Sequence, residues 1–75
     1  MSNLLLLKLN QIRTLRNQVL EKKELTKSLI RVMGISDGIL KMKINLLIDE
    51  YYTQQVQQLE PKLHLLEELA REIES

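Results

Sequence analysis

The chain has 75 residues, a net charge of +1 and no cysteine, and 44% of its residues are hydrophobic while 28% are charged. A chain of this size buries only about 60 to 65% of the surface that it exposes when unfolded, so a monomer has little stability in reserve. The lack of cysteine excludes disulfides and thiolate metal sites. Regular helix packing or oligomerisation must therefore supply the stability that a larger core would provide.

Composition and charge indicate helices that face each other. The chain has seventeen leucines and seven isoleucines, but two aromatic residues, two glycines and one proline. Leucine, lysine, glutamate, glutamine and arginine favour helices, so we predict an all-α fold. Residues 1–34 carry seven basic and two acidic residues (+5), and residues 35–75 carry four basic and eight acidic residues (−4). Because the two halves have opposite net charge, we expect them to face each other, within one chain or between two chains.

The first predicted helix covers about residues 3–33. Its apolar residues form a stripe at helical spacing, made of Leu5, Leu9, Ile12 and Val19 with Leu15 and Leu20 at its margins. Leu25, Leu29 and Val32 fall roughly opposite this stripe. Either the helix continues with two apolar faces for two partners, or it bends near residues 21–24. The continuous helix is favoured, because nothing in the sequence EKKELTKSL breaks a helix.

The sequence GISDG at residues 34–38 predicts a turn. Gly34 suits a left-handed helix end, and Ser36 or Asp37 suits the N-cap of a following helix. A connection of this length joins two antiparallel helices into an αα-hairpin.

The second predicted helix covers about residues 37–59. Leu40, Ile44, Leu47 and Tyr51 are spaced four, three and four residues apart, which gives one apolar stripe. Tyr51 continues this stripe, so we expect it in the core. Tyr52 points away from the stripe, which makes it the better candidate for contact with a partner.

A heptad-like seam follows in the C-terminal segment. It consists of Val56, Leu59, Leu63, Leu66, Ala70 and Ile73, and Leu65 and Leu69 add a second apolar row. Pro61 interrupts the seam, so residues 61–74 form either a kinked continuation of the second helix or a third helix. We expect this coiled-coil-like segment to be a second interface, distinct from the core of the hairpin. The chain as a whole, residues 1–75, is predicted to be one small domain that is oligomeric.

The residues that could act in catalysis or bind a metal do not form recognisable motifs in the sequence. Serine, histidine and aspartate have no triad context, and Gly34 and Gly38 lack the flanking residues of a phosphate-binding loop. His64 has no acidic or histidine partners in a ligand cluster. The sequence therefore predicts no cofactor, no metal and no enzyme activity.

The apolar run LLLLKL at residues 4–9 is too short to span a bilayer, which takes about 20 apolar residues. It also lacks the basic start and the cleavage site of a signal peptide. We expect a soluble, cytoplasmic protein with no membrane partner. Nucleic acid is not the expected partner, because the basic residues are spread around the first helix without interleaved aromatic residues.

Residues 40–52, LKMKINLLIDEYY, resemble the signature helix of the small helical-hairpin aspartyl-phosphate phosphatases linked to sporulation in spore-forming bacteria. In that family a Ser-Gln-Glu-Leu-Asp run is followed, after one residue, by Leu-Ile and one or two tyrosines. The matching positions here are Leu40, Leu47, Ile48, Glu50, Tyr51 and Tyr52. Residues 11–20, QIRTLRNQVL, also resemble the first helix of the family, so the resemblance covers roughly residues 9–52. It implies a helical hairpin that acts on a phosphorylated response regulator.

The signature run itself differs from the family pattern. Its five positions are Lys41, Met42, Lys43, Ile44 and Asn45 here, and only the change from leucine to isoleucine is conservative. Release of phosphate from an aspartate needs groups that orient water, with an acidic residue as the base, and Asn45 cannot accept a proton as a carboxylate does. We therefore expect that the reaction has been lost.

The sequence favours a non-catalytic helical module for protein–protein interaction or regulation, which self-associates, binds a partner protein, or does both. Two alternatives stay open: a phosphatase acting on the aspartyl phosphate of a response regulator, and a nucleic-acid-binding helical protein. The candidate partner-binding residues are Lys41, Lys43, Asn45, Tyr52, Leu63, Leu66, Leu69 and Ile73.

Overall fold

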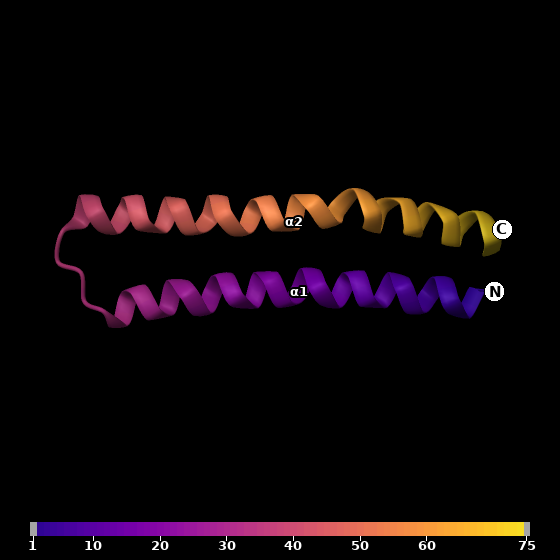
Figure 1. The fold of residues 1–75 in the computed structure, drawn as a ribbon, viewed down its shortest axis with the longest axis horizontal. Coiled ribbons are helices and arrows are strands. Elements are labelled where there is room, and N and C mark those ends of the chain that lie inside the picture. The colour runs from indigo at the N-terminus through magenta and orange to yellow at the C-terminus, as the bar shows by residue number, and fades with distance from the viewer. Residues whose placement is uncertain (1, 75) are drawn as a thin grey trace.

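Two helices account for almost the whole chain in the computed structural model, which describes the backbone of residues 2–74 and the side chains of residues 3–73. Helix α1 spans Ser2–Val32 and helix α2 spans Gly38–Glu74. They lie side by side and antiparallel, with both chain ends at the same end of the hairpin (Figure 1). The Cα atoms form a rod of 56 × 17 × 13 Å. The predicted all-α hairpin is confirmed; residues 1 and 75, at the ends of the predicted domain, lie outside the described residues.

Helix α1 continues through residues 21–24 without a break. Of the two alternatives for this region, the structure contains the continuous helix with two apolar faces. Leu9 and Ile12 lie on the face toward α2 and are buried, whereas Leu25, Leu29 and Val32 are exposed, Val32 to 84%. The second apolar face of α1 is therefore largely uncovered within the described chain.

The predicted turn is confirmed in detail. Gly34 has a φ of 65°, the left-handed conformation that suits glycine at a helix end, and its N–H donates to the carbonyl of Arg31 at 3.2 Å. Asp37 then caps α2, because its Oδ1 accepts hydrogen bonds from the backbone N–H groups of Ile39 at 3.0 Å and Leu40 at 3.2 Å. The two caps fix where one helix ends and the next begins.

The core is small and lies toward the open end of the hairpin. Leu9, Ile12 and Leu63 form a buried cluster against which Leu59 and Leu66 pack. Leu63 is only 2% exposed. The sequence suggested that the C-terminal segment is an interface distinct from the hairpin core. This expectation is wrong for Leu63, which is part of the core. Within the heptad-like seam of this segment, Leu63 is a buried core residue and Leu66 packs against it, whereas Ile73 at the end of the seam is exposed.

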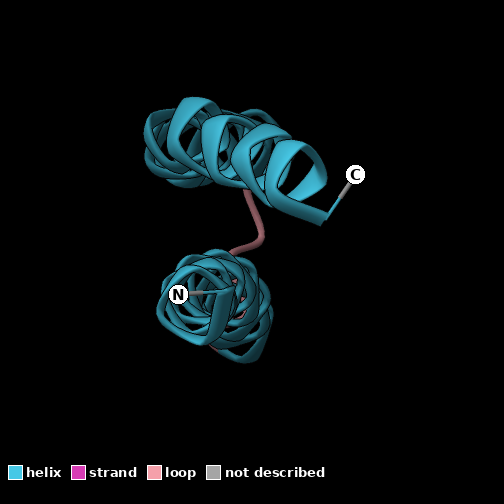
Figure 2. Cartoon of the chain, turned by 90° about the vertical axis from the view of Figure 1, so that its right-hand side faces the viewer, coloured by secondary structure: helices cyan, strands magenta, loops and turns pink. Residues whose placement is uncertain are grey.

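Pro61 lies inside α2, which continues through it, so residues 38–74 do not divide into two helices. Proline has no N–H to offer the carbonyl of Gln57, and its ring crowds that carbonyl, which bends a helix. Pro61 is exposed, and Leu59 and Leu63, each about half a turn away, face α1. A bend away from the proline directs the following turns toward α1. The C-terminal end of α2, yellow in Figure 1, leaves the line of the preceding turns, and the end-on view in Figure 2 shows the same end of the helix turned aside.

Candidate interaction surface

The basic and acidic halves of the chain meet across the two helices. In four ion pairs between the helices, α1 supplies the cation and α2 the anion. The pairs are Arg13–Glu67 at 3.4 Å, Arg16–Glu60 at 3.7 Å, Lys23–Asp49 at 3.6 Å and Lys27–Asp49 at 2.6 Å. The charge asymmetry of the sequence is thus used within one chain. We call the side of the hairpin that carries these pairs the ion-pair face.

Asp49 is the centre of charge on the ion-pair face. Its Oδ1 lies 2.6 Å from Lys27 Nζ and 3.6 Å from Lys23 Nζ, and this oxygen is almost out of contact with solvent. The hydrogen bond from Lys27 lowers the pKa of the Asp49 carboxyl, and the positive charges of Lys27 and Lys23 lower it further, while partial desolvation acts in the opposite direction. Asp49 is therefore held as an anion, which makes it a weak base.

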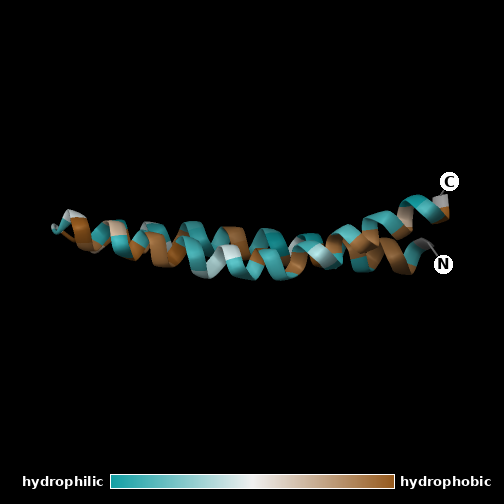
Figure 3. Cartoon of the chain, turned by 90° about the horizontal axis from the view of Figure 1, so that it is seen from above, coloured by the Kyte–Doolittle hydropathy of each residue, from teal (hydrophilic) through white to brown (hydrophobic). Residues whose placement is uncertain are grey.

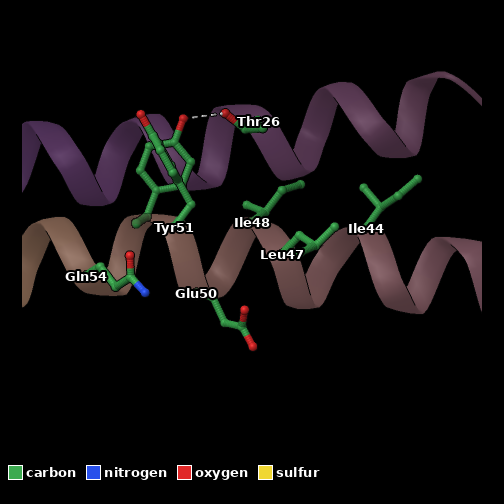
Figure 4. A pocket seen from close by; sticks show the side chains of 8 residues that line it. Thr26, Ile44, Leu47, Ile48, Glu50, Tyr51 and Gln54 are labelled. Atoms are coloured by element: carbon green, nitrogen blue, oxygen red, sulfur yellow. Dashed lines mark hydrogen bonds between the residues drawn. The ribbon is translucent and has the colours of Figure 1, made fainter.

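The two tyrosines have exchanged the positions expected from the sequence. The hydroxyl of Tyr52 lies 3.0 Å from Thr26 Oγ1 (Figure 4), and Thr26 donates its own proton to the carbonyl of Lys22 at 2.8 Å. Tyr52 is therefore the donor to Thr26, and it belongs to the contact between the helices. Tyr51, expected in the core, is 60% exposed and packs edge-on against the Tyr52 ring with centroids 5.0 Å apart.

An apolar stripe runs along α2 on the side away from Asp49, Glu60 and Glu67, although Glu50 borders it in the groove near the turn. Near the turn it lines an open groove with Leu47, Tyr51 and Gln54 (Figure 4). The stripe consists of Leu40, Leu47, Tyr51, Leu65 and Leu69, all exposed, with Gln54 and Gln58 at its centre. Asp49, Glu60 and Glu67 each lie two residues from a member of this stripe, which is about half a turn around the helix. The stripe and the ion pairs thus face opposite ways.

A matching stripe on α1 lies on the same side of the hairpin. Its exposed members are Leu4, Leu7, Leu15, Leu25 and Leu29, with the polar residues Gln11, Gln18 and Lys22 between them. Leu15 lines one groove together with Tyr51, Gln54 and Gln58 of α2, which places the two stripes side by side. We call the two stripes together the apolar face.

Leucines occupy the two ends of the apolar face, and glutamines occupy its middle. Gln11 and Gln18 on α1, with Leu15 between them, and Gln54 and Gln58 on α2 lie between the leucines of the open end and those near the turn. Seen from above, hydrophobic and hydrophilic residues alternate along both helices (Figure 3). The face therefore has a pattern along its length and is not uniformly hydrophobic.

Other predicted site residues near the turn are divided between two surfaces. Lys41 and Asn45 are half-buried and line a small hollow with Lys27 and Arg31 of α1, on the ion-pair side. Lys43 is exposed on the outer side of α2. Lys41 and Asn45 are thus brought together, four residues apart on one side of α2, while Lys43 is separate from them.

The predicted site residues of the C-terminal segment also separate. Leu69 and Ile73 are exposed and remain available to a partner, whereas Leu63 and Leu66 belong to the core. The stripe on α1 was absent from the predicted site, although its spacing was a usable signal. Leu4 and Leu7 are three residues apart and Leu25 and Leu29 are four residues apart, and the 18 residues between Leu7 and Leu25 are five helical turns.

The remaining polar groups offer little for chemistry. His64 is exposed and lies 3.6 Å from Glu68 Oε1. Within the described part of the chain, no group of three histidine, cysteine, aspartate or glutamate residues could hold a metal ion. Neither described helix is apolar over a length that would cross a bilayer. No family model, curated protein or solved structure matches this chain. The surface itself is therefore the guide to function.

Proposed function

We propose that this hairpin is a non-catalytic interaction module that self-associates or binds a partner protein through its apolar face. The observation that carries the proposal is the imbalance between covered and uncovered hydrophobic side chains. Among the described residues, eighteen large hydrophobic side chains are exposed, and four are buried. Burying each leucine-sized side chain favours association by about 1.5 to 3 kcal/mol. Contiguous exposed patches larger than about 300 to 600 Å² mark interaction sites in soluble proteins.

The surroundings of Lys41 and Asn45 support binding over hydrolysis. The hollow that they share with Lys27 and Arg31 is basic and contains no carboxylate among its lining residues. The carboxylate of Asp49 is already paired with Lys23 and Lys27, and its lowered pKa makes it a poor proton acceptor. The place where a related phosphatase would present an aspartate thus has an amide and positive charge.

Two neighbouring leucines of α2 provide a matched test. Leu47 belongs to the apolar face, and Leu46 is similarly exposed but lies about 100° around the helix. Leu47→Lys is expected to abolish association, while Leu46→Lys is expected to retain it. Light scattering at micromolar concentration measures the mass, and circular dichroism checks that both variants remain helical. We expect at least twice the 8.8 kDa chain mass for the unmodified protein or, if it binds another protein, a defined complex.

The opposite result is equally clear. A helical species of 8.8 kDa that forms no complex, and on which the two substitutions have the same effect, would overturn the proposal. Such a result would mean that the hairpin tolerates its exposed leucines without using them.

A further inference from the structure

We infer that the apolar face is covered by a second copy of this chain, turned about the long axis of the hairpin so that α1 of each copy lies over α2 of the other. The four helices then form a bundle in which both turns lie at the same end. This inference rests on the proposed function and names the partner. It is carried by the size of the face, its pattern along the long axis and the charges of the two helices.

The size of the face suits a second hairpin. Its extent between Cα atoms, 56 × 17 Å, is about 950 Å². Stable protein–protein interfaces bury about 800 Å² on each partner. A second copy has the same length and width, so it covers the whole face, whereas a single helix would leave one of the two stripes exposed. Two hairpins stacked in this way give the common antiparallel four-helix arrangement.

The pattern along the face matches itself at the levels of Leu7, Gln18 and Leu29, whereas Gln11 comes level with Leu65 and Leu4 with Glu72. Arg16–Glu60 and Lys27–Asp49 show that residues at one level of the hairpin have numbers that add to about 76. A turn about the long axis keeps every residue at its level. It therefore places Leu7 over the partner's Leu69, Leu29 over the partner's Leu47, and Gln18 over the partner's Gln58.

The glutamine middle has a specific role in this arrangement. A glutamine amide both donates and accepts hydrogen bonds, so Gln18 and Gln58 can satisfy each other across the interface. A leucine opposite either of them would leave its amide without a partner. Polar residues in an otherwise apolar seam fix the register of helices in this way, so the central glutamines oppose sliding of one hairpin along the other.

Charge separates this arrangement from the other symmetric one. A stack with the two turns at opposite ends would also place leucines over leucines, but it would set α1 over α1 and α2 over α2. Helix α1 has seven basic and two acidic residues (+5), and α2 has four basic and seven acidic residues (−3). That stack would set two helices of like net charge over each other, whereas the inferred stack sets a basic helix over an acidic one.

The position of the turns gives a direct measurement. The chain has no cysteine, and Ser36 is exposed in the turn, so Ser36→Cys accepts a single nitroxide label in the full chain. Pulsed electron paramagnetic resonance should give a distance within about 25 Å, the width of a four-helix bundle with its label arms. The hairpin is 56 Å long, so turns at opposite ends would give on the order of 50 Å. Excess unlabelled chain should remove the signal, which shows that it arises between copies.

Salt dependence gives an independent readout. Association of unlike helices should weaken as sodium chloride is raised from low to physiological concentration, because screening removes an attraction. A stack of like helices would be strengthened by the same change. A distance on the order of 50 Å, or association that strengthens with salt, would overturn the inferred stack. A monomeric chain would overturn the second copy as the partner, and the proposed function would then stand only if another protein bound Leu46→Lys but not Leu47→Lys.

Discussion

The two broad faces of the hairpin are built from the same two helices and differ in what completes them. On the ion-pair face, each cation of α1 meets an anion of α2, and the contacts are finished within one chain. On the apolar face, the stripes of α1 and α2 lie side by side and leave their leucines exposed. Ion pairs as exposed as these contribute about 0 to 1 kcal/mol each. The charges of the two helices are thus paired within the chain on the ion-pair face, whereas the hydrophobic side chains of the apolar face are left largely uncovered.

The largest expected effect separates the core from the apolar face. Leu63→Ala should lower the free energy of unfolding by about 2 to 5 kcal/mol, because it opens a cavity in the cluster with Leu9 and Ile12. Leu65→Ala, two residues away on the apolar face, should change the stability of the monomer by less than about 1 kcal/mol. Urea unfolding of both variants in the Leu47→Lys background isolates the monomer. Equal losses would mean that the apolar face is part of the fold.

The turn that aligns the two faces should give the next effect. Gly34→Ala should cost about 1 to 2 kcal/mol, since its φ of 65° is strained for any residue with a Cβ. The space around the added methyl group is open, so the cost is one of backbone conformation. Gly38→Ala is the control, because Gly38 has no left-handed φ and the same open space. Thermal melting measures both, and an unchanged melting temperature for Gly34→Ala would contradict the strain.

The exchange of the tyrosines predicts a difference between two identical substitutions. Tyr52→Phe removes the hydrogen bond to Thr26 and should cost about 0.5 to 1.5 kcal/mol. Tyr51→Phe should leave the stability of the monomer unchanged, because that side chain is largely exposed. If Tyr51→Phe were the costlier change under chemical denaturation, the assignment of the two faces on α2 would be reversed.

The ion-pair face should show a pH dependence that the apolar face lacks. The pKa of Asp49 is lowered in the folded chain, so its carboxylate adds stability above the usual value of 3.8, and this stability is lost as the pH falls through the lowered pKa. The melting temperature of Asp49→Asn should therefore lie below that of the unmodified chain at pH 7, and the difference should shrink in acid. Glu50→Gln, on the neighbouring residue, is the control. If the difference in melting temperature between Asp49→Asn and the unmodified chain did not change with pH, the ion pairs would not be its cause.

The last prediction is that the hairpin has no accelerating effect on the hydrolysis of an aspartyl phosphate. Added in molar excess to a phosphorylated response regulator, the hairpin should not shorten the half-life of the aspartyl phosphate, because Asn45 supplies no base. An unchanged or longer half-life agrees with an interaction module. A shorter half-life that Asn45→Ala abolishes would show that the hollow around Lys41 and Asn45 is catalytic.

The hairpin was predictable because its signals are local. Gly34 and Asp37 carry the turn chemistry in their own side chains and backbone, and the spacing of leucines gives the helical stripes. The stripe that would face α1 was harder to predict, because α2 has apolar residues around most of its circumference near the turn. Tyr52 rather than Tyr51 faces α1 because its hydroxyl bonds to Thr26, a residue 26 positions away in the sequence. The heptad-like seam containing Leu63 was visible in the sequence, but heptad spacing does not say which helix fills it.

The bend at Pro61 has a consequence for how the hairpin opens. The carbonyl of Gln57 has no amide partner at Pro61, so α2 has a weakened turn next to the cluster of Leu9, Ile12 and Leu63. The part of α2 beyond Pro61 can therefore unfold as a unit when Leu63 leaves α1, while the turn-proximal half keeps its caps and ion pairs. Regions that open together in this way show a common rate of amide hydrogen exchange. We expect residues 62–74 to exchange as one group, faster than the amides around Ile48.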